Sequence, residues 1–426
     1  MSLPSKLLYE NSIQSSYARN FTSVINAQNT SEYNVGQTCI INIPTMNNQF
    51  LSGSDTILNY KLKVRASVAT TYANLVRAGG AGAIQRLRLF HGSTLLCDID
   101  NYATLAGLMT AYQLSSDDVK GKSKVLQGTD EGGHGVDLGV IATGADTELD
   151  LSFPLISILS LTDNYVPCWS MTNAPLRLEL QFVSNLAQLI TSDQSLVAAG
   201  SGNVFHDVKL IANFVEVSDA GMSIVRSSLG DGPVSWVCSS YSNYVFNTNL
   251  PTAEKQVSMP VPAKFNSLKA MYFVFREQFA GVATKPCDDA PNFKLKEYST
   301  RIGSKVIPSE KPNSVPQFLA EMERALGSVG NRISPHSYTS AEITAETSVG
   351  AGASARAAAF AIGVETESYS SAPMNSVYQG LNTATDDVFF QPTFSAQASA
   401  TDIRIDGFAH YDQLCIIDNG QAQVQF

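Results

Sequence analysis

The chain has 426 residues, of which 44% are hydrophobic and only 15% are charged, with a formal net charge of −10. This length is enough for two domains with separate cores, and the acidic balance argues against a protein that neutralises nucleic-acid phosphates, because such binding depends on clustered Lys and Arg. Typical soluble domains carry about 25% charged residues. The low share here therefore predicts much surface buried against partners, although a surface rich in Ser, Thr and Asn would look the same.

The chain opens with a polar segment that has no regular hydrophobic pattern. Residues 1–35 are rich in Ser, Asn and Gln, and their few basic and acidic side chains cancel. Such a segment cannot build a core of its own, so it predicts an extended arm ahead of the folded domains. Because the arm is not basic, no direct nucleic-acid binding is expected from it.

Strand patterns begin directly after the arm. Residues 38–44 form an apolar run, and residues 57–67 alternate apolar and polar side chains, which is typical of a half-buried strand. Residues 84–96 contain two strand-like runs joined by Gly92 and Ser93, a pair that predicts a tight hairpin turn. Further strand-like runs follow at 148–156, 176–183 and 208–217.

One segment between these strands changes to a helical period. Residues 101–114 place Tyr102, Leu105 and Leu108 at helical spacing, and Asp100 is a plausible N-cap. The following stretch, residues 115–147, is rich in Gly and Asp and is predicted as a long loop.

The same order of patterns recurs in the second half of the chain. Gly303 and Ser304 join two strand-like runs within residues 298–308, 211 positions after Gly92 and Ser93. The matching segments before and after this turn are the apolar runs 256–262 and 267–277, the helical stretch 314–328 with Ser314 as its cap, the long loop 328–370, and the closing strands 401–411 and 414–426. The repeated order predicts that one half is a structural copy of the other.

Strands separated by Gly, Pro and Asn turns, without alternating helices, favour an antiparallel sandwich over a βαβ fold. We therefore expect an all-β protein made of two tandem eight-stranded antiparallel jelly-roll sandwiches, each with a short helix in a loop. The expected divisions are an arm (1–35), a first jelly roll (36–222) and a second jelly roll (223–426). Within this scheme Gly92, Ser93, Gly303 and Ser304 are structural turns of the repeated segment.

One strand of the second half has an unusual composition. Residues 271–277, MYFVFRE, are apolar without alternation until their last two positions. A strand with one face in water would alternate, so this run predicts a strand covered on both faces, by its own core and by a neighbouring domain or subunit.

The sequence shows no catalytic constellation, cofactor motif or metal-ligand cluster. The five histidines are isolated, and acidic pairs such as Asp288-Asp289 do not have the spacing of a calcium loop. His410 and Asp412 would share one face of a strand, where a buried or interfacial hydrogen-bonded pair is the simplest interpretation. We therefore expect a protein that is not an enzyme and that needs no cofactor.

The six cysteines are widely separated, and most lie in apolar surroundings. They predict small buried residues and not a disulfide framework, which in turn suggests folding in a reducing compartment. No apolar stretch is long enough for a membrane-spanning helix or the core of a signal peptide.

Several of these segments together resemble a known family. They are residues 84–109, 265–277, 301–326 and 403–421, which carry the strand, Gly turn, strand and helix order and the closing strands. In this order they resemble the double jelly-roll major capsid proteins of tailless icosahedral DNA viruses, a group that includes adenovirus-like viruses, virophages and polinton-like viruses.

The resemblance implies a structural protein that trimerises into pseudo-hexagonal capsomers and tiles an icosahedral shell. It also implies penton and minor capsid proteins as partners, an internal membrane beneath the shell in some relatives, and a place in the virion. The long loops 115–147 and 328–370 would face outward or contact other subunits, and the arm would tie neighbours together beneath the shell.

Two other interpretations stay open. The chain could be a different virion assembly protein, such as a spike, a penton or a single-jelly-roll capsid protein with an added domain. It could also be a carbohydrate-binding β-sandwich, although Trp169 and Trp236 are the only tryptophans available for a sugar platform.

Overall fold

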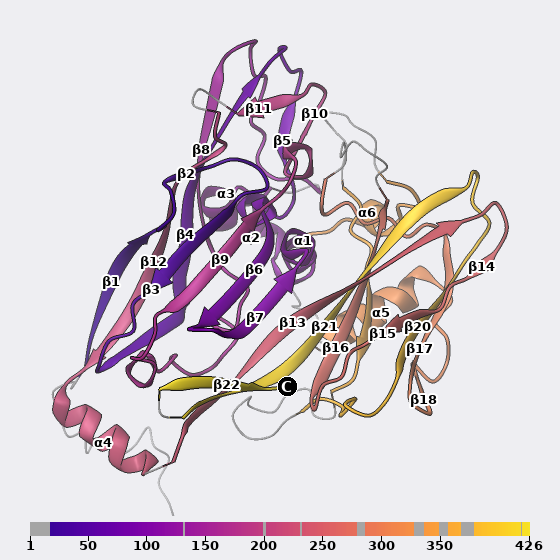
Figure 1. The fold of residues 1–426 in the computed structure, drawn as a ribbon. Helices are drawn as coiled ribbons and strands as arrows, with labels where there is room; N and C mark the ends of the chain where they lie inside the picture. The colour runs from indigo at the N-terminus through magenta and orange to yellow at the C-terminus, as the bar shows by residue number, and fades with distance from the viewer. Residues whose placement is uncertain are drawn as a thin grey trace, which may run out of the picture.

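The computed structural model describes residues 18–130, 133–198, 202–230, 232–278, 286–327, 336–348, 357–367, 379–418 and 420–426. Within these residues the chain forms two β-sandwiches that lie side by side (Figure 1). None of the helices in this part of the chain is long and apolar enough to cross a membrane.

The first half contains most of the short elements. Its strands are β1 (Ala18–Asn26), β2 (Glu32–Tyr33), β3 (Thr38–Ile43), β4 (Gln49–Ala66), β5 (Ala73–Leu75), β6 (Ile84–His91), β7 (Thr94–Asp100), β8 (Asp146–Pro154), β9 (Leu176–Phe182), β10 (Ile190–Ser192), β11 (Leu196–Ala198) and β12 (Phe205–Val217). Its helices are α1 (Tyr102–Gln113), α2 (Ser116–Lys120), α3 (Lys122–Gln127) and the 3-10 turns η2 (Gly79–Ala83), η3 (Cys168–Ser170) and η4 (Leu186–Gln188).

Helix α4 (Asp219–Leu229) connects the two halves at one end of the molecule (Figure 1). The strands of the second half are β13 (Val234–Leu250), β14 (Lys255–Gln256), β15 (Met259–Val261), β16 (Leu268–Glu277), β17 (Leu295–Ile302), β18 (Lys305–Ile307), β19 (Ile362–Glu365), β20 (Val388–Phe394), β21 (Thr401–Asp418) and β22 (Gln421–Gln425). Its helices are α5 (Val315–Leu326) and α6 (Ser340–Thr344).

Both halves have the same strand connections. The eight main strands, in chain order, are β1, β3, β4, β6, β7, β8, β9 and β12 in the first half and β13 and β15 to β21 in the second. In each half the first of these eight pairs with the last, the last with the third and the third with the sixth, giving the sheets β1-β12-β4-β8 and β13-β21-β16-β19. The second pairs with the seventh, the seventh with the fourth and the fourth with the fifth, giving β3-β9-β6-β7 and β15-β20-β17-β18. All these pairs are antiparallel, so the prediction of two eight-stranded jelly rolls is confirmed.

Aromatic side chains fill the space between the two sheets of each sandwich. In the first half Tyr60 contacts Phe153 and Phe205 edge to face, at ring-centroid distances of 6.0 and 5.7 Å. In the second half Phe273 stacks on Phe390 at 3.7 Å. Each sandwich therefore has its own core, as the alternating strands predicted.

The predicted helices are present as α1 and α5, each between the fifth and sixth main strands of its half. The N-cap of α1 is Asn101, and the prediction of Asp100 was wrong by one residue; Asp100 instead accepts a hydrogen bond from the Asn101 backbone. The stretch 115–147, expected as a loop, contains α2 and α3, and much of the predicted loop 328–370 lies outside the described residues.

The region expected as an arm is folded where the structure describes it. Residues 18–26 form β1, which pairs along its whole length with β12 and stacks Phe21 on Phe214 at 5.7 Å. This strand holds the same place in the first half as β13 holds in the second. The first sandwich thus includes a strand within the stretch 1–35.

Candidate functional site at the junction of the two halves

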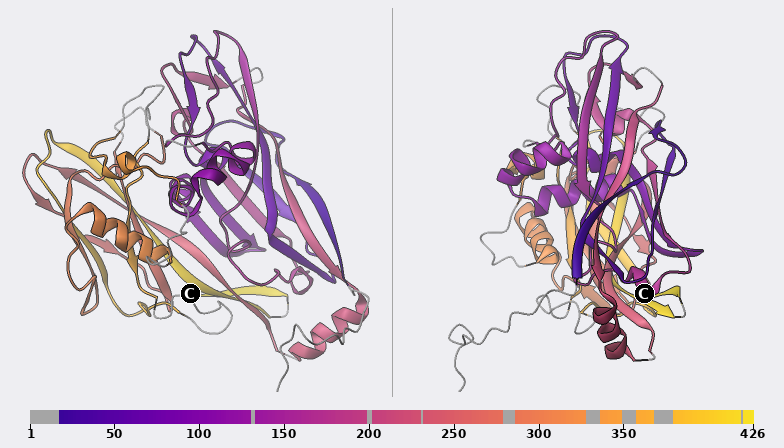
Figure 2. Two further views of the ribbon diagram at one scale, coloured as in Figure 1. Left: turned by 180° about the vertical axis from the view of Figure 1, so that it is seen from behind. Right: turned by 90° about the vertical axis from the view of Figure 1, so that its left-hand side faces the viewer.

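The two sandwiches meet along a buried junction, where the helix side of the first half faces one sheet of the second. Helix α1 lies between the halves (Figure 2), and eleven of its twelve residues are buried. On the other side, nine of the ten residues of β16 are buried, so the predicted cover on both faces of this strand is confirmed. The junction is therefore an internal interface and not a loose contact.

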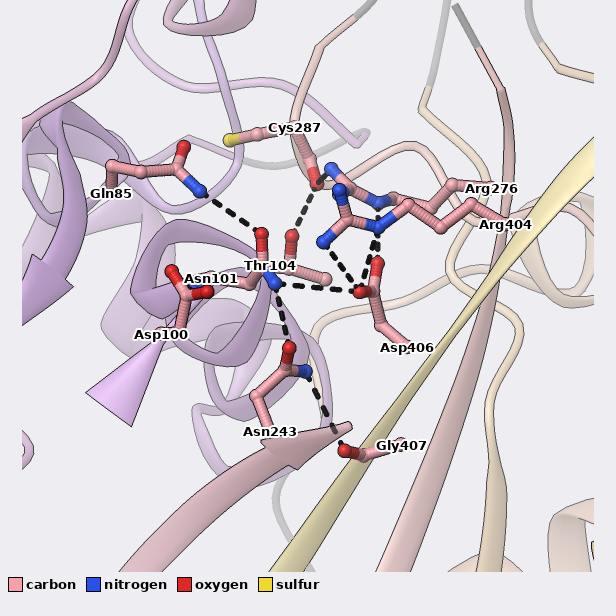
Figure 3. A network of polar contacts seen from close by, with 10 residues as sticks. All are labelled: Gln85, Asp100, Asn101, Thr104, Asn243, Arg276, Cys287, Arg404, Asp406 and Gly407. Carbon is pink, nitrogen blue, oxygen red and sulfur yellow. Dashed lines mark hydrogen bonds and ion pairs between the residues drawn. The ribbon is translucent and has the colours of Figure 1, made fainter. Parts of the chain in front are cut away.

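A fully buried carboxylate lies at the centre of this junction (Figure 3). Asp406 on β21 accepts hydrogen bonds from Arg276 Nε on β16 and from Arg404 Nε, both at 2.9 Å. Arg276 also donates to the carbonyl oxygen of Cys287 at 2.8 Å. Two guanidinium groups thus pair with one carboxylate, which satisfies the rule that buried charges are paired.

The first half reaches this carboxylate through Asn101, the residue that precedes α1. Its backbone has a φ of 50°, in the left-handed region that Asn enters more readily than most residues. The side-chain amide donates to Asn243 Oδ1 at 2.7 Å and to Asp406 Oδ1 at 3.5 Å, and its oxygen accepts from Gln85 at 3.0 Å (Figure 3). Asn101 therefore fixes the start of α1 to β13 and β21.

A second buried ion pair joins the halves. Arg77 Nη2, just before η2, donates to Glu342 Oε2 on α6 at 2.9 Å and to the Ala357 carbonyl at 2.7 Å. The side chains of Arg77 and Glu342 are only 3% and 1% exposed. Glu342 also caps α6 through Thr339. One carboxylate thus links the helix cap of the second half to the first half.

The acidic pair Asp288-Asp289, for which the sequence indicated no calcium loop, lies at the same junction. Asp288 Oδ2 accepts a hydrogen bond from the backbone of Ala78 at 3.1 Å. A Cβ atom on Gly107 of α1 would lie 2.6 Å from Asp288 Cβ, so only glycine permits this approach. Burial raises the pKa of Asp288, and the nearby Arg77 opposes that rise.

A third group of contacts joins β7 of the first half to β13 and β21. Gln413 Nε2 donates to the Leu96 carbonyl at 2.7 Å, and Cys97 Sγ lies 3.5 Å from Ser240 Oγ. Burial raises the pKa of Cys97 to about 11. All six cysteines are buried free thiols, as the sequence predicted, and a protonated thiol is a poor nucleophile.

These contacts hold two domains together and do not resemble catalytic machinery. In the part of the chain that the structure describes, no group of three or more His, Cys, Asp or Glu could hold a metal ion. Asp412 accepts hydrogen bonds from Ser267 (2.7 Å) and Ser239 (3.3 Å), whereas His410 stacks on Tyr241 with centroids 4.7 Å apart. That the protein is not an enzyme stays a prediction.

The residues named from the repeated turn occupy equivalent hairpins. Gly92 (φ 57°) and Ser93 separate the paired residues at the ends of β6 and β7, and Gly303 (φ 56°) and Ser304 do so between β17 and β18. Positive φ at the first of two loop residues alone is the geometry of a type II′ turn, which favours Gly there. These turns take no part in the junction contacts above.

Comparison with known proteins identifies the fold. No protein-family model and no curated protein matches the chain. Among solved structures, the PBCV-1 virus capsid model matches 98% of this chain and 100% of its own at 11% identity, with a TM-score of 0.65. The Faustovirus major capsid protein (97% and 92% covered, 9% identity, TM-score 0.61) and the mavirus major capsid protein (100% and 93%, 13%, 0.54) match similarly.

The chain has the double jelly-roll fold. At 9–13% identity these likenesses concern the fold, and they confirm at that level the resemblance seen in the sequence. Because the matches span nearly both chains in full, the double jelly-roll as a whole is shared, including the presence of two sandwiches in one polypeptide.

Proposed function

We propose that the chain is a major capsid protein, of which three copies form a pseudo-hexagonal capsomer that tiles an icosahedral viral shell. The observation that carries this proposal is the junction between the two halves. It joins unlike faces of two like domains, and each half leaves the complementary face without a partner among the residues that the structure describes. Contacts between unlike faces can repeat from one molecule to the next until a ring closes.

The first unpartnered face belongs to the second half. Helix α5 corresponds to α1 in chain order, yet only Phe318 and Met322 of its twelve residues are buried. In α1 all but one residue are buried, because α1 packs on η2 and β6 of its own half and is covered by segments of the second half that bond to it through Cys287, Ser337 and Ala359. The side of α5 that faces solvent in the single chain is therefore the surface where the next sandwich would dock.

The second unpartnered face is the outer surface of the β1-β12-β4-β8 sheet. It corresponds to the surface of β13-β21-β16-β19 that packs against α1. A row of apolar side chains crosses its four strands in register: Val24, Ile211, Ile57 and Pro154. Val24 is 57% exposed in the single chain. A repeat of the internal contact would cover this row with the α5 side of a second copy.

This arrangement supports a ring of six sandwiches built from three chains. In it, the jelly rolls correspond to about residues 36–222, with β1 added, and 223–426. We infer further partners from the fold relatives: the capsid lattice itself, penton and minor capsid proteins, and a membrane beneath the shell in some viruses. The place of action would be the virion, and no direct nucleic-acid binding is expected of a chain with a net charge of −10.

Light scattering on the purified protein tests the proposal. The expected species has about three times the chain mass of 45.7 kDa and appears in negative stain as a flat six-cornered particle. A stable monomer at micromolar concentration would refute it. Pentamers or elongated rods would instead favour a penton or spike protein.

A matched pair of variants tests the proposed faces. Val24→Glu places a charge in the apolar row, and we expect it to convert trimers to monomers. Ile224→Glu is the control, because Ile224 is similarly exposed at 60% and belongs to α4, the helix at the end of the molecule (Figure 1) and part of neither face. Equal effects of both variants would exclude the assignment of the faces while leaving the trimer itself untouched.

A further inference from the structure

A small enclosed cavity lies inside the junction. It is lined from the first half by Arg77, Thr104 and Gly107, and from the second half by Val274 and Asp288, among others. The volume open to the centre of a water molecule is about 10 Å³. A cavity needs roughly 10–15 Å³ on this measure to hold one water molecule, so this space is large enough for one and too small for a larger ligand.

One oxygen atom of Asp288, a residue that lines this cavity, lacks a hydrogen bond. Asp288 is 5% exposed, and its Oδ2 is bonded to the Ala78 backbone. Its Oδ1 is buried and has no partner among the described residues. Unpaired buried carboxylate oxygens are rare, because each loses the hydrogen bonds that water would give it. The atom therefore points to a missing donor.

We propose that one water molecule occupies this cavity, donates a hydrogen bond to Asp288 Oδ1, and bridges the two sandwiches. The hydroxyl of Thr104 already donates to the Cys287 carbonyl at 2.9 Å, so its oxygen remains available to accept the second hydrogen of the water. Arg77 lines the same space from the first half and would supply the donor to the water. Three polar partners are the usual number for a buried water.

Other occupants fit less well. A metal cation needs more oxygen ligands than this wall provides, and the positive charge of Arg77 would oppose it. A proton on Asp288 would not remove the need, since the new hydroxyl would itself require an acceptor. The inference does not depend on the proposed function, because it concerns only the contact between the halves of one chain.

The first test is structural. A crystal or cryo-EM map of the full chain, at a resolution that shows ordered solvent, should contain one peak within hydrogen-bond distance of Asp288 Oδ1 and Thr104 Oγ1. Asp288→Asn should keep this peak, because the amide can donate to the water where the carboxylate accepted from it. An empty cavity would overturn the proposal, as would a peak with six or more oxygen neighbours, which would indicate a cation.

The second test uses the cavity wall. Val274→Ile adds one methylene to the space, and we expect it to displace the water and to lower the melting temperature by about 3 °C. Overpacking alone could also lower it, so the same substitution is made in the Asp288→Val background, where a side chain of comparable bulk leaves no carboxylate to lose a partner. If the water is bonded as proposed, the shift shrinks by at least half there. Equal shifts in both backgrounds would refute the bridge.

Discussion

The Arg77–Glu342 ion pair gives the sharpest test of whether the junction stabilises the protein. Glu342→Gln removes the negative charge and keeps the shape of the side chain. The capping of α6 by Thr339 survives, because Gln serves at this position of a capping box as well as Glu. What changes is that Arg77, 3% exposed, loses the carboxylate that it contacts directly, and the nearby Asp288 is a carboxylate to which it makes no ion pair among the described residues.

The expected cost follows from burial. Removing one partner of a buried ion pair typically costs about 3–5 kcal/mol, because the remaining charge is left in a poorly solvating environment. Arg77 retains its hydrogen bond to the Ala357 carbonyl at 2.7 Å, which favours the lower end of that range. We therefore expect a loss of about 3 kcal/mol in the free energy of unfolding.

The chain supplies a matched control. Glu297 pairs with Lys311 at the same distance of 2.9 Å, but the two side chains are 32% and 48% exposed. Glu297→Gln should cost less than about 1 kcal/mol, as exposed pairs do. Urea unfolding is followed by the fluorescence of the two tryptophans, Trp169 and Trp236, and by circular dichroism. If the two variants shift the unfolding midpoint equally, the junction pair is not the stabilising contact that its burial suggests.

Two further predictions concern single residues. Gly303→Ala should destabilise the protein by about 1–2 kcal/mol through its positive φ. The loss should exceed that of Gly92→Ala, because a Cβ on Gly303 would lie 2.9 Å from Asp386 Oδ1. Thermal unfolding of both variants measures the order, and a larger loss for Gly92→Ala would contradict it. Burial and the charge of Lys269 lower the pKa of His410 to about 3. Only the unfolded state then gains a proton as the pH falls from about 6.5, and stability should decrease by up to about 1.4 kcal/mol per unit. Urea midpoints between pH 7 and 4.5 measure this slope; it should be shallower in His410→Gln, and an unchanged slope would rule out His410 as its source.

The sequence predicted the fold because jelly-roll strands carry their burial in a short-range pattern. Residues 57–67 alternate because one face packs on the core. All of this stretch except its last residue belongs to β4. The turns at Gly92 and Gly303 could be recognised from two residues each. β1 was missed because its strand pattern is weak. Asn20, Thr22 and Asn26 are among its exposed positions, and these polar residues make the segment resemble a polar tail.

The junction could not be predicted in the same way. Asn101 and Asp406 are 305 positions apart, and neither residue type nor local spacing indicates that they meet. One signal was present, in the uninterrupted apolar run of β16, which predicted cover on both faces without identifying the partner. Helix α4 was not predicted either. Only Gly221 and Met222 of its residues are buried, so it has no broad apolar face that would mark a helix in the sequence.

The difference between the two copies is itself informative about when each contact forms. Helix α1 has no charged residue, and a helix of that composition needs a cover as soon as it folds, which the second half of the same chain provides. Helix α5 occupies the equivalent place and carries Glu321, Glu323 and Arg324. A surface that must stay in solution until another chain arrives needs such charges, because large exposed apolar patches associate without specificity. If α5 docks on a second copy as proposed, the duplicated fold distinguishes, by composition alone, a permanent contact within the chain from one that is made during assembly.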